Sequence, residues 1–415
     1  MKRFVSLVLA LVMLFCLAAC GKTDKDGEKK DGEKMKVGFI CLHDENSTYD
    51  LNFINAAKEA CEKLGVEAVF KKNIPEDASC KEAALDLADK GCKIVFADSF
   101  GHESYMIEAA KEAPDVQFCH ATGTTAHTAN VKNFHNAFAS IYEGRYLAGV
   151  AAGLKLNEMI KDGKIKAEEA KIGYVGAFTY AEVISGYTSF FLGARSICPT
   201  ATMEVQFTGS WYDETAEKEA ATTLIANKCV LISQHADSMG APTACENAKV
   251  PNVSYNGSTV KACPNTFIVS SRIDWAPYYE YIIGCVKDGK EIDTDWTGTL
   301  ATGSVVLTEV NDKAAAAGTA EKIEAVKADI ESGKIHVFDT SKFTVTVDAA
   351  KGLNANAKID ADGHLTSYMA DVNADEKHEG DTEVVKDGFF AESTFRSAPY
   401  FDLKIDGITL LNTKF

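Results

Sequence analysis

Apolar residues along this chain follow two alternating periods from residue 36 onward. Short continuous apolar runs, typical of buried strands, are followed by segments in which apolar residues recur every three or four positions, typical of helices. Gly65 and Gly91 directly follow two of these helical segments, as glycines at helix C-termini do. The pattern predicts strands at 37–41, 66–70, 93–97 and 116–119, and helices at 55–64, 81–90 and 105–112.

The same alternation begins again after a long predicted helix at 142–156. Strands that alternate with helices form parallel sheets joined by crossover helices. Because each series has the length of a small domain, we predict an α/β protein with two similar Rossmann-like lobes and a cleft between them. The second series predicts strands at 172–175, 203–207 and 229–232, and helices at 183–195 and 215–226.

The pattern changes near the C-terminus, and residues 343–415 are predicted to form a short β-rich extension. Phe343–Val347 alternates apolar and polar residues like a half-exposed strand. Turn signals such as Asp362-Gly363 and Asp406-Gly407 recur, and helical patterns are few. We expect short antiparallel strands packed on one lobe rather than an independent domain.

The first twenty residues have the pattern of an export signal. Lys2 and Arg3 are followed by an uncharged, largely apolar segment that ends at Gly21. The string Leu17-Ala18-Ala19-Cys20-Gly21 resembles a bacterial lipobox, so residues 1–20 are predicted to hold a lipoprotein signal peptide with Cys20 as the lipidated residue. An ordinary signal peptide and a stop-transfer helix are the alternatives, although the apolar run is short for a span of about 20 residues.

The segment after the predicted signal peptide is rich in charge and glycine. Residues 21–35 contain almost no apolar side chains, so they are predicted to be a flexible linker. The protein is therefore expected to be extracytoplasmic and lipid-anchored to the bacterial cell membrane.

Charge and cysteine content narrow the classes of partner. The formal net charge of −17 argues against nucleic acid as a partner and against electrostatic docking on anionic lipid. Besides Cys16 and Cys20, ten cysteines lie between Cys41 and Cys285 without a CxxC pair. We expect most of them to be buried free thiols, and the pattern leaves one or two disulfides open.

Signatures of catalysis and of metal binding are absent from the sequence. GxSxG, HExxH and Walker motifs do not occur. Asp360–Gly363 partly matches a calcium loop, but Lys358 and Met369 occupy the first and twelfth positions, where acids are required, so a turn is predicted. His120 and His127 flank a Thr- and Gly-rich loop but have no third ligand. We therefore expect no metal, no cofactor, no catalytic residue and no enzymatic activity.

Aromatic and amide residues collect just after the predicted strands, where open α/β sheets bind ligands. Flat aromatic faces with a few amides and acids suit a planar heterocycle. A sugar would also stack on them, but sugar sites usually carry more carboxylates and arginines. Any single aromatic here could instead fill the core at a lobe edge. The candidate ligand-binding residues are Tyr49, Asn52, Phe53, Phe100, Phe178, Trp211, Asp237, Asn256 and Trp275.

Several strings of this chain resemble one family as a set. They are Asp98–Gly101, Ala113–Phe118, His120–Gly123, Tyr142–Val150, Leu192–Ser196, Trp211–Asp213, Gln234-His235 and Trp275 with Pro277–Tyr279. Together they resemble the basic membrane protein (PnrA-like) family of substrate-binding lipoproteins that serve ABC importers. The resemblance covers about residues 36–290, with a weaker tail.

This resemblance implies a type I periplasmic-binding fold with three hinge crossovers. Lobe 1 would then span residues 36–140, with about 258–295 returning to it. Lobe 2 would span residues 141–257, with about 296–342 returning to it.

The resemblance also implies a purine base or purine nucleoside as the ligand. Trp211 falls where the family places its stacking aromatic, and Phe53 and Phe100 match other aromatic positions. Nucleoside-binding members carry an acid where this chain has Asn256, and a lysine where Arg272 lies. Since an acid often grips ribose hydroxyls, its absence favours a base.

These observations lead to one hypothesis and three alternatives. A monomeric, membrane-tethered receptor would close its lobes on a purine-type molecule between Trp211 and an aromatic of lobe 1. Asn52, Asp237 or Asn256 would read the edge of that molecule, and ABC permease subunits would receive it. The alternatives are an exported nucleoside-processing enzyme, a sugar receptor of the same fold and a sensory receptor.

Overall fold

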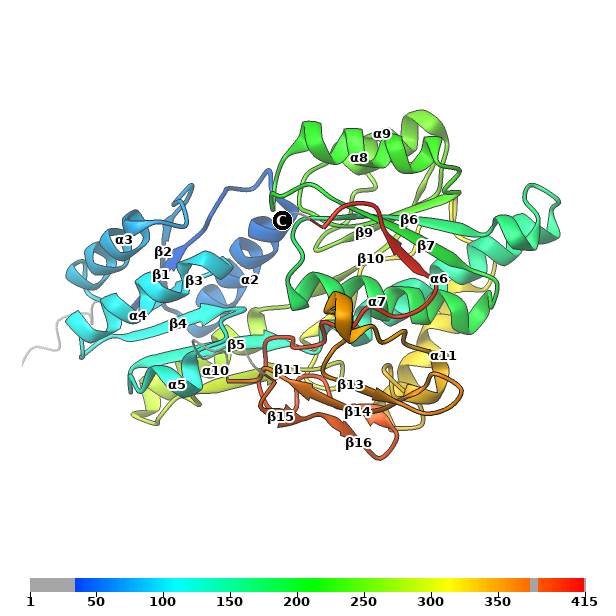
Figure 1. Ribbon diagram of the computed structural model, residues 1–415. Helices are drawn as coiled ribbons and strands as arrows, with labels where there is room; N and C mark the ends of the chain where they lie inside the picture. Colours follow the sequence, from blue (N-terminus) through cyan, green and yellow to red (C-terminus); the bar gives the residue numbers. More distant parts are fainter. Residues whose placement is uncertain (1–33, 374–379, 414–415) are drawn as a thin grey trace, which may run out of the picture. The chain divides into compact units, whose positions relative to one another are not determined.

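The computed structural model describes residues 34–373 and 380–413, so the predicted signal peptide, Cys20 and nearly all of the predicted linker lie outside them. The N-terminal part of the described chain and one later strand form a wholly parallel sheet (Figure 1). Its strands run in the order β11-β5-β4-β3-β1-β2. They are β1 (Lys36–Ile40), β2 (Glu67–Lys71), β3 (Cys92–Ala97), β4 (Gln117–Ala121), β5 (Phe134–Ala139) and β11 (Asp295–Gly298).

Helices cover both faces of this first sheet. The helices α2 (Thr48–Leu64) and α10 (Ala276–Asp288) pack together over one face, on an apolar core that includes Phe39 and Phe96. On the other face, α3 (Ala78–Asp89) and α4 (Glu103–Glu112) pack over a second apolar cluster. A short helix, α5 (Ala126–Ala129), precedes β5.

A second sheet is formed by the middle of the chain together with one strand from its C-terminal end, in the order β12-β10-β9-β8-β6-β7-β18. All its pairs are parallel except β10 with β12. Its strands are β6 (Lys171–Gly176), β7 (Thr202–Phe207), β8 (Leu231–His235), β9 (Asn252–Tyr255), β10 (Phe267–Ile273), β12 (Val305–Leu307) and β18 (Ile408–Leu410). Its helices are α6 (Ile141–Lys161), α7 (Ala181–Ile197), α8 (Glu214–Ala226), α9 (Gly240–Ala248) and α11 (Thr319–Glu331). The predicted α/β class with two lobes is confirmed.

Every strand and helix predicted between residues 37 and 232 is present, with ends that differ. The largest difference is at α2, which begins at Thr48 rather than at residue 55. Ser47 caps this helix, because its hydroxyl accepts a hydrogen bond from the main-chain N–H of Asp50 at 3.2 Å. Because the first turns of α2 contain several polar residues, the apolar periodicity does not indicate where the helix begins. They also bring polar side chains to the carboxyl end of β1.

The crossovers between the sheets differ from those that the resemblance implied. The segment expected to return to lobe 1 near residue 258 remains in the second sheet until Ile273, because β10 pairs with β9 and β12. The strand β11 then returns to the first sheet beside β5, and the chain crosses again before β12. β10 is almost wholly buried, and its short apolar run Phe267–Val269 is followed by Ser270, Ser271 and Arg272, so its pattern does not say which sheet contains it.

The C-terminal extension contains short strands and contacts both sheets. Its strands β13 (Ala357–Ile359), β14 (Leu365–Ala370) and β15 (Thr382–Glu383) form one antiparallel sheet, and β16 (Val385–Lys386) pairs with β17 (Phe389–Phe390). The last strand, β18, instead extends the second sheet in parallel with β7. Ser397 donates a main-chain hydrogen bond to Asp295 of the first sheet at 2.7 Å. The extension is therefore not confined to one lobe.

Phe343–Val347 does not form the predicted strand. The apolar and polar alternation is real, because Phe343 and Val345 are buried. The hydroxyls of Thr344 and Thr346 donate to the two carboxylate oxygens of Asp406, at 2.7 and 2.8 Å. Contacts between loops, rather than strand pairing, thus explain why apolar and polar residues alternate in this segment. The turn predicted at Asp360–Gly363 is present.

Two of the glycines in the strings that carry the family resemblance have a packing role. A Cβ atom on Gly149 of α6 would lie 2.0 Å from the carbonyl oxygen of Phe190 in α7. A Cβ atom on Gly193 of α7 would lie 2.0 Å from the carbonyl oxygen of Tyr146 in α6. The two helices therefore cross with their backbones in direct contact.

The ten cysteines from Cys41 to Cys285 are all buried and unpaired in the part of the chain that the structure describes. This confirms the prediction of buried free thiols. None of the disulfides that the sequence pattern allowed is formed among these ten cysteines. Burial raises the pKa of several of these thiols, to about 11 for Cys61, for example. In the same described segments, no helix has the length and apolar character needed to cross a membrane.

Candidate functional site

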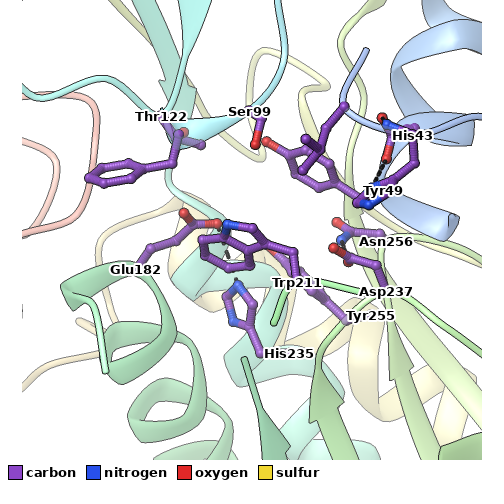
Figure 2. Close-up of a pocket in the computed structure, with 13 residues that line it drawn as sticks. His43, Tyr49, Ser99, Thr122, Glu182, Trp211, His235, Asp237, Tyr255 and Asn256 are labelled. Atoms are coloured by element: carbon purple, nitrogen blue, oxygen red, sulfur yellow. Dashed lines mark hydrogen bonds and ion pairs between the residues drawn. The ribbon is translucent and has the colours of Figure 1, made fainter. Parts of the chain in front are cut away.

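A cavity lies where the carboxyl ends of the two parallel sheets face each other (Figure 2). The empty space between its lining side chains is about 360 Å³, part of which is open to solvent, and it receives side chains from both lobes. Open α/β sheets bind ligands at this edge. The lining residues are Leu42, His43, Tyr49, Asp50, Ser99, Phe100 and Thr122 from the first lobe, and Glu182, Trp211, His235, Asp237, Tyr255 and Asn256 from the second.

The first turn of α2 supplies much of the first wall. The hydroxyl of Tyr49 donates a hydrogen bond to the main-chain carbonyl of Asp98 at 2.6 Å. The main-chain N–H of His43 donates to Asp50 Oδ1 at 2.8 Å, and the His43 ring nitrogen Nδ1 lies 3.5 Å from Asp50 Oδ2. These contacts hold the phenol and the carboxyl group in single orientations at the cavity.

A buried acidic group lies behind this wall. Ligand atoms of Cys41, Asp50 and Asp98 lie within 4.8 Å of one another, which is a spacing that a metal ion could use. Burial first, and then the neighbouring charge of Asp50, hold the pKa of Asp98 well above its usual range. Burial likewise raises the pKa of the Cys41 thiol. Without a metal ion, both groups therefore favour their protonated forms, so binding of a metal here would release protons.

Thr122 adds an unsatisfied and strained group to the first wall. Its φ of 67° lies in the left-handed region, which a β-branched residue rarely adopts. Its hydroxyl oxygen is buried and has no hydrogen-bond partner among the residues that the structure describes. Strain and an unpaired polar atom together at one cavity residue are typical of a position that contacts a ligand.

Glu182 and His235 form a pair in the second wall. Glu182 lies in the first turn of α7, and its Oε1 is 3.4 Å from Nε2 of His235 at the end of β8. Burial lowers the pKa of His235, so its imidazole is neutral and carries one ring proton. A Cβ atom on Gly186 would lie 2.7 Å from Nδ1, which therefore faces the α7 backbone. We assign the proton to Nε2, from which it is donated to Glu182.

Asp237 and Asn256 complete the polar part of the second wall. The Asn256 side chain donates a hydrogen bond to Asp237 Oδ1 at 3.1 Å. Asn256 has a φ of 64°, a conformation that asparagine tolerates better than most residues. Burial first, and then the charge of Glu217, raise the pKa of Asp237 well above its usual range.

Direct contacts between the lobes close the cavity. The main-chain N–H and the hydroxyl of Thr48 both donate to the carbonyl of Asp237, at 3.0 and 3.2 Å. The Phe100 ring of the first lobe lies 5.2 Å from the Tyr180 ring of the second, centroid to centroid. The site therefore has the geometry of a closed receptor.

Trp211 is the largest aromatic residue that lines the cavity, and it is braced from within the second lobe. The Phe178 ring meets its indole edge-on, with the centroids 5.0 Å apart, and Tyr180 stacks on Phe178 at 5.1 Å. The carbonyl oxygen of Trp211 accepts a hydrogen bond from the main-chain N–H of Asp237 at 3.0 Å. This aromatic cluster gives the indole a fixed position beside Glu182 and His235 (Figure 2).

The structure brings five of the nine predicted site residues together at the cavity. These are Tyr49, Phe100, Trp211, Asp237 and Asn256. Four others do not line it, because Phe178 lies behind Trp211, and Phe53 and Trp275 are buried and stack on each other with their centroids 4.4 Å apart. Asn52 lines a neighbouring polar cleft, where its amide oxygen accepts a hydrogen bond from Arg272 at 3.2 Å.

Sequence reasoning did not select His43, Glu182 and His235 as site residues. Glu182 occupies the first turn of a helix, where an acid is expected simply to complement the helix dipole. His43 follows the end of β1 but is followed by other polar residues, so it does not stand out. His235 belongs to one of the strings that carry the family resemblance, and its neutral state and its carboxylate partner depend on the folded lobe.

Two α/β lobes with a cavity between the carboxyl ends of their sheets are the architecture that solute-binding proteins have. The family model of ABC transporter substrate-binding proteins described as Bmp, PnrA-like, matches residues 41–340 of this chain. The chain belongs to this family of ABC transporter substrate-binding proteins. Such proteins work outside the cytoplasm, where they bind small molecules and interact with permease components.

Individual relatives support the same family but carry different ligand names. A purine-binding protein of Brucella abortus is 35% identical over 62% of this chain and 70% of its own length. A putative ABC transporter glucose-binding protein of Haloferax volcanii is 32% identical over 60% of this chain and 62% of its own length. An ABC transporter solute-binding protein of Aeropyrum pernix has a similar fold, with 18% identity, a TM-score of 0.62, and coverage of 76% of this chain and 95% of its own.

Proposed function

We propose that this protein captures a purine base or purine nucleoside in the interlobe cavity and delivers it to the permease of an ABC importer. The observation that carries the proposal is the placement of Trp211, a braced indole that faces the cavity opposite Tyr49 of the other lobe. A flat heterocycle can stack on such a surface while amide and carboxyl groups bind its edge. The name of the Brucella relative supports the same ligand class.

A sugar is the second candidate ligand. The name of the Haloferax relative favours it, and the cavity holds three carboxyl groups beside an indole. Sugar sites, however, usually pair carboxylates with arginines, and Arg272 lies in the neighbouring cleft rather than in this cavity. We therefore favour the purine as the ligand, and glucose should be titrated beside it as the competing candidate.

Replacing Trp211 with alanine should weaken purine binding at least about tenfold, because a stacked aromatic pair contributes about 1 kcal/mol or more beyond its buried area. Isothermal titration of residues 36–415 with adenine, guanine, inosine and glucose would measure this loss. Trp296→Ala is the matched control, because Trp296 packs on Tyr278 and Tyr281 away from the cavity.

Two outcomes of this titration would contradict the proposal. One is heat from glucose and none from any purine. The other is conversion of inosine into base and sugar, seen by chromatography after incubation, because a receptor that does not catalyse a reaction returns its ligand unchanged. Conversion of inosine is the result expected if the protein is instead an exported nucleoside-processing enzyme.

We further propose that Cys20 carries the lipid that holds this receptor at the cell membrane, with residues 21–35 as the linker. The net charge of −17 supports this proposal, since it disfavours adhesion to anionic lipid by charge alone. In a bacterial host, Cys20→Ser should move the protein from the membrane fraction to the soluble fraction. Cys16→Ser should leave it with the membrane, and a Cys20→Ser protein that stays there would contradict a lipid on Cys20.

A further inference from the structure

Three carboxyl groups of the cavity share one arrangement. In each of them, one oxygen lies near a nitrogen donor from the protein, and the group belongs to a residue that lines the cavity. The donor atoms are the main-chain N–H of His43 for Asp50, the Asn256 side chain for Asp237 and Nε2 of His235 for Glu182, at 2.8, 3.1 and 3.4 Å respectively. The cavity thus presents oriented acceptors.

The cavity offers these acceptors no internal cation. Among the described residues that line it, none is lysine or arginine, and both histidines there already face a carboxyl group. Leaving carboxylate oxygens in a closed, water-poor space without a donor is costly. A ligand that brings N–H groups to these oxygens therefore stabilises the closed state, and a ligand that brings carbonyl or phosphate oxygens to them is repelled.

Glu182 is the best placed of the three to read one edge of a stacked ring. Its carboxylate lies beside the indole of Trp211, at the base of the cavity (Figure 2). Asp237, by contrast, is 4% exposed and has a raised pKa that favours the protonated form. Asp50 has a second buried carboxyl group, Asp98, directly behind it.

We propose that Glu182, oriented by His235, accepts a hydrogen bond from the exocyclic amino group of the bound base and selects aminopurines over their oxo counterparts. The inference rests on the proposed purine function and specifies which purines bind. Adenine and hypoxanthine differ at one such position, and guanine and xanthine at another. An oxo group placed there turns its own lone pairs toward the carboxylate, so the site loses a hydrogen bond and gains repulsion.

The test compares each amino and oxo pair by isothermal titration with the wild-type chain and with Glu182→Gln. The wild type should bind the amino member of a pair at least about tenfold more tightly, since a hydrogen bond to a charged group contributes about that much or more. Glutamine keeps the shape of glutamate but can donate an N–H to an oxo group. The Glu182→Gln variant should therefore lose about tenfold or more for the aminopurine and gain for the oxopurine, so that the preference narrows or reverses.

Glu204→Gln is the matched control, because Glu204 lies on β7 and pairs with Lys171 at 2.7 Å, outside the cavity. It should leave both preferences unchanged. A merely structural role of Glu182 would weaken all purines equally, and that result would overturn the inference. If the Glu182→Gln variant bound purines with the same amino-over-oxo preference as the wild type, the inference would be overturned and the proposed function would stand. If the wild-type chain bound no purine at all, the proposed function itself would be overturned.

Discussion

A chain that ends at Lys342 should not reach the native fold of its second lobe. The family match ends at residue 340, yet the following extension supplies part of the same apolar core. The fully buried Phe401 ring stacks on Phe338 with the centroids 4.3 Å apart, and Phe338 in turn packs on Tyr142 of α6 at 5.3 Å. Truncation would expose these faces and remove β18 from the edge of the second sheet.

The expected result is loss of the cooperative urea transition, with circular dichroism as the measurement. A point variant keeps the prediction testable if the truncated chain aggregates. Phe401→Ala should lower the free energy of unfolding by about 3 to 5 kcal/mol, the usual cost of removing a buried phenylalanine. Phe395→Ala, at a half-buried ring of the same extension, should cost about 1 kcal/mol or less. A truncated chain with an unchanged urea midpoint would show that the extension is dispensable.

The periodicity of apolar residues predicted the fold well for strands that are buried on both faces and for helices that have one buried face. Buried parallel strands read as continuous apolar runs and amphipathic helices as spaced ones, so the strands and helices between residues 37 and 232 could be recognised. Pairing partners were not predictable in the same way. The sequences of β10 and β18 do not indicate which sheet each strand joins. Their pairing depends on contacts with residues that are distant in the sequence.

The site was predicted through topology rather than through a catalytic signature. Residues after parallel strands meet at one edge, which brought Tyr49, Trp211 and Asp237 to the cavity from distant parts of the sequence. The same rule also selected Phe53 and Trp275, which are core residues, because a strand-end aromatic has the same sequence pattern in either role. The Glu182 and His235 pair depends on the three-dimensional approach of α7 and β8, for which the sequence has no local signal.

Replacing Arg145 with methionine should strongly destabilise the second lobe. This arginine of α6 is fully buried, and its guanidinium donates hydrogen bonds to Tyr174 and Ser233 at 2.9 and 3.0 Å and to Ser271 at 3.3 Å. These partners belong to three different strands of the second sheet. Methionine fills similar space but leaves the buried hydroxyls without their donor, so we expect a loss of about 3 kcal/mol in the free energy of unfolding.

The same substitution should weaken ligand binding, although Arg145 does not line the cavity. Its guanidinium lies 5.0 Å from the centroid of the Tyr255 ring, and Tyr255 both lines the cavity and packs on His235. Losing this support loosens the wall that orients Glu182, so affinity should fall together with the urea midpoint. Arg195→Met, at a half-buried arginine over the Phe191 ring on α7, should change neither by more than a small amount. If Arg145→Met and Arg195→Met gave equal urea midpoints, the hydrogen bonds of Arg145 would not be what holds these strands together.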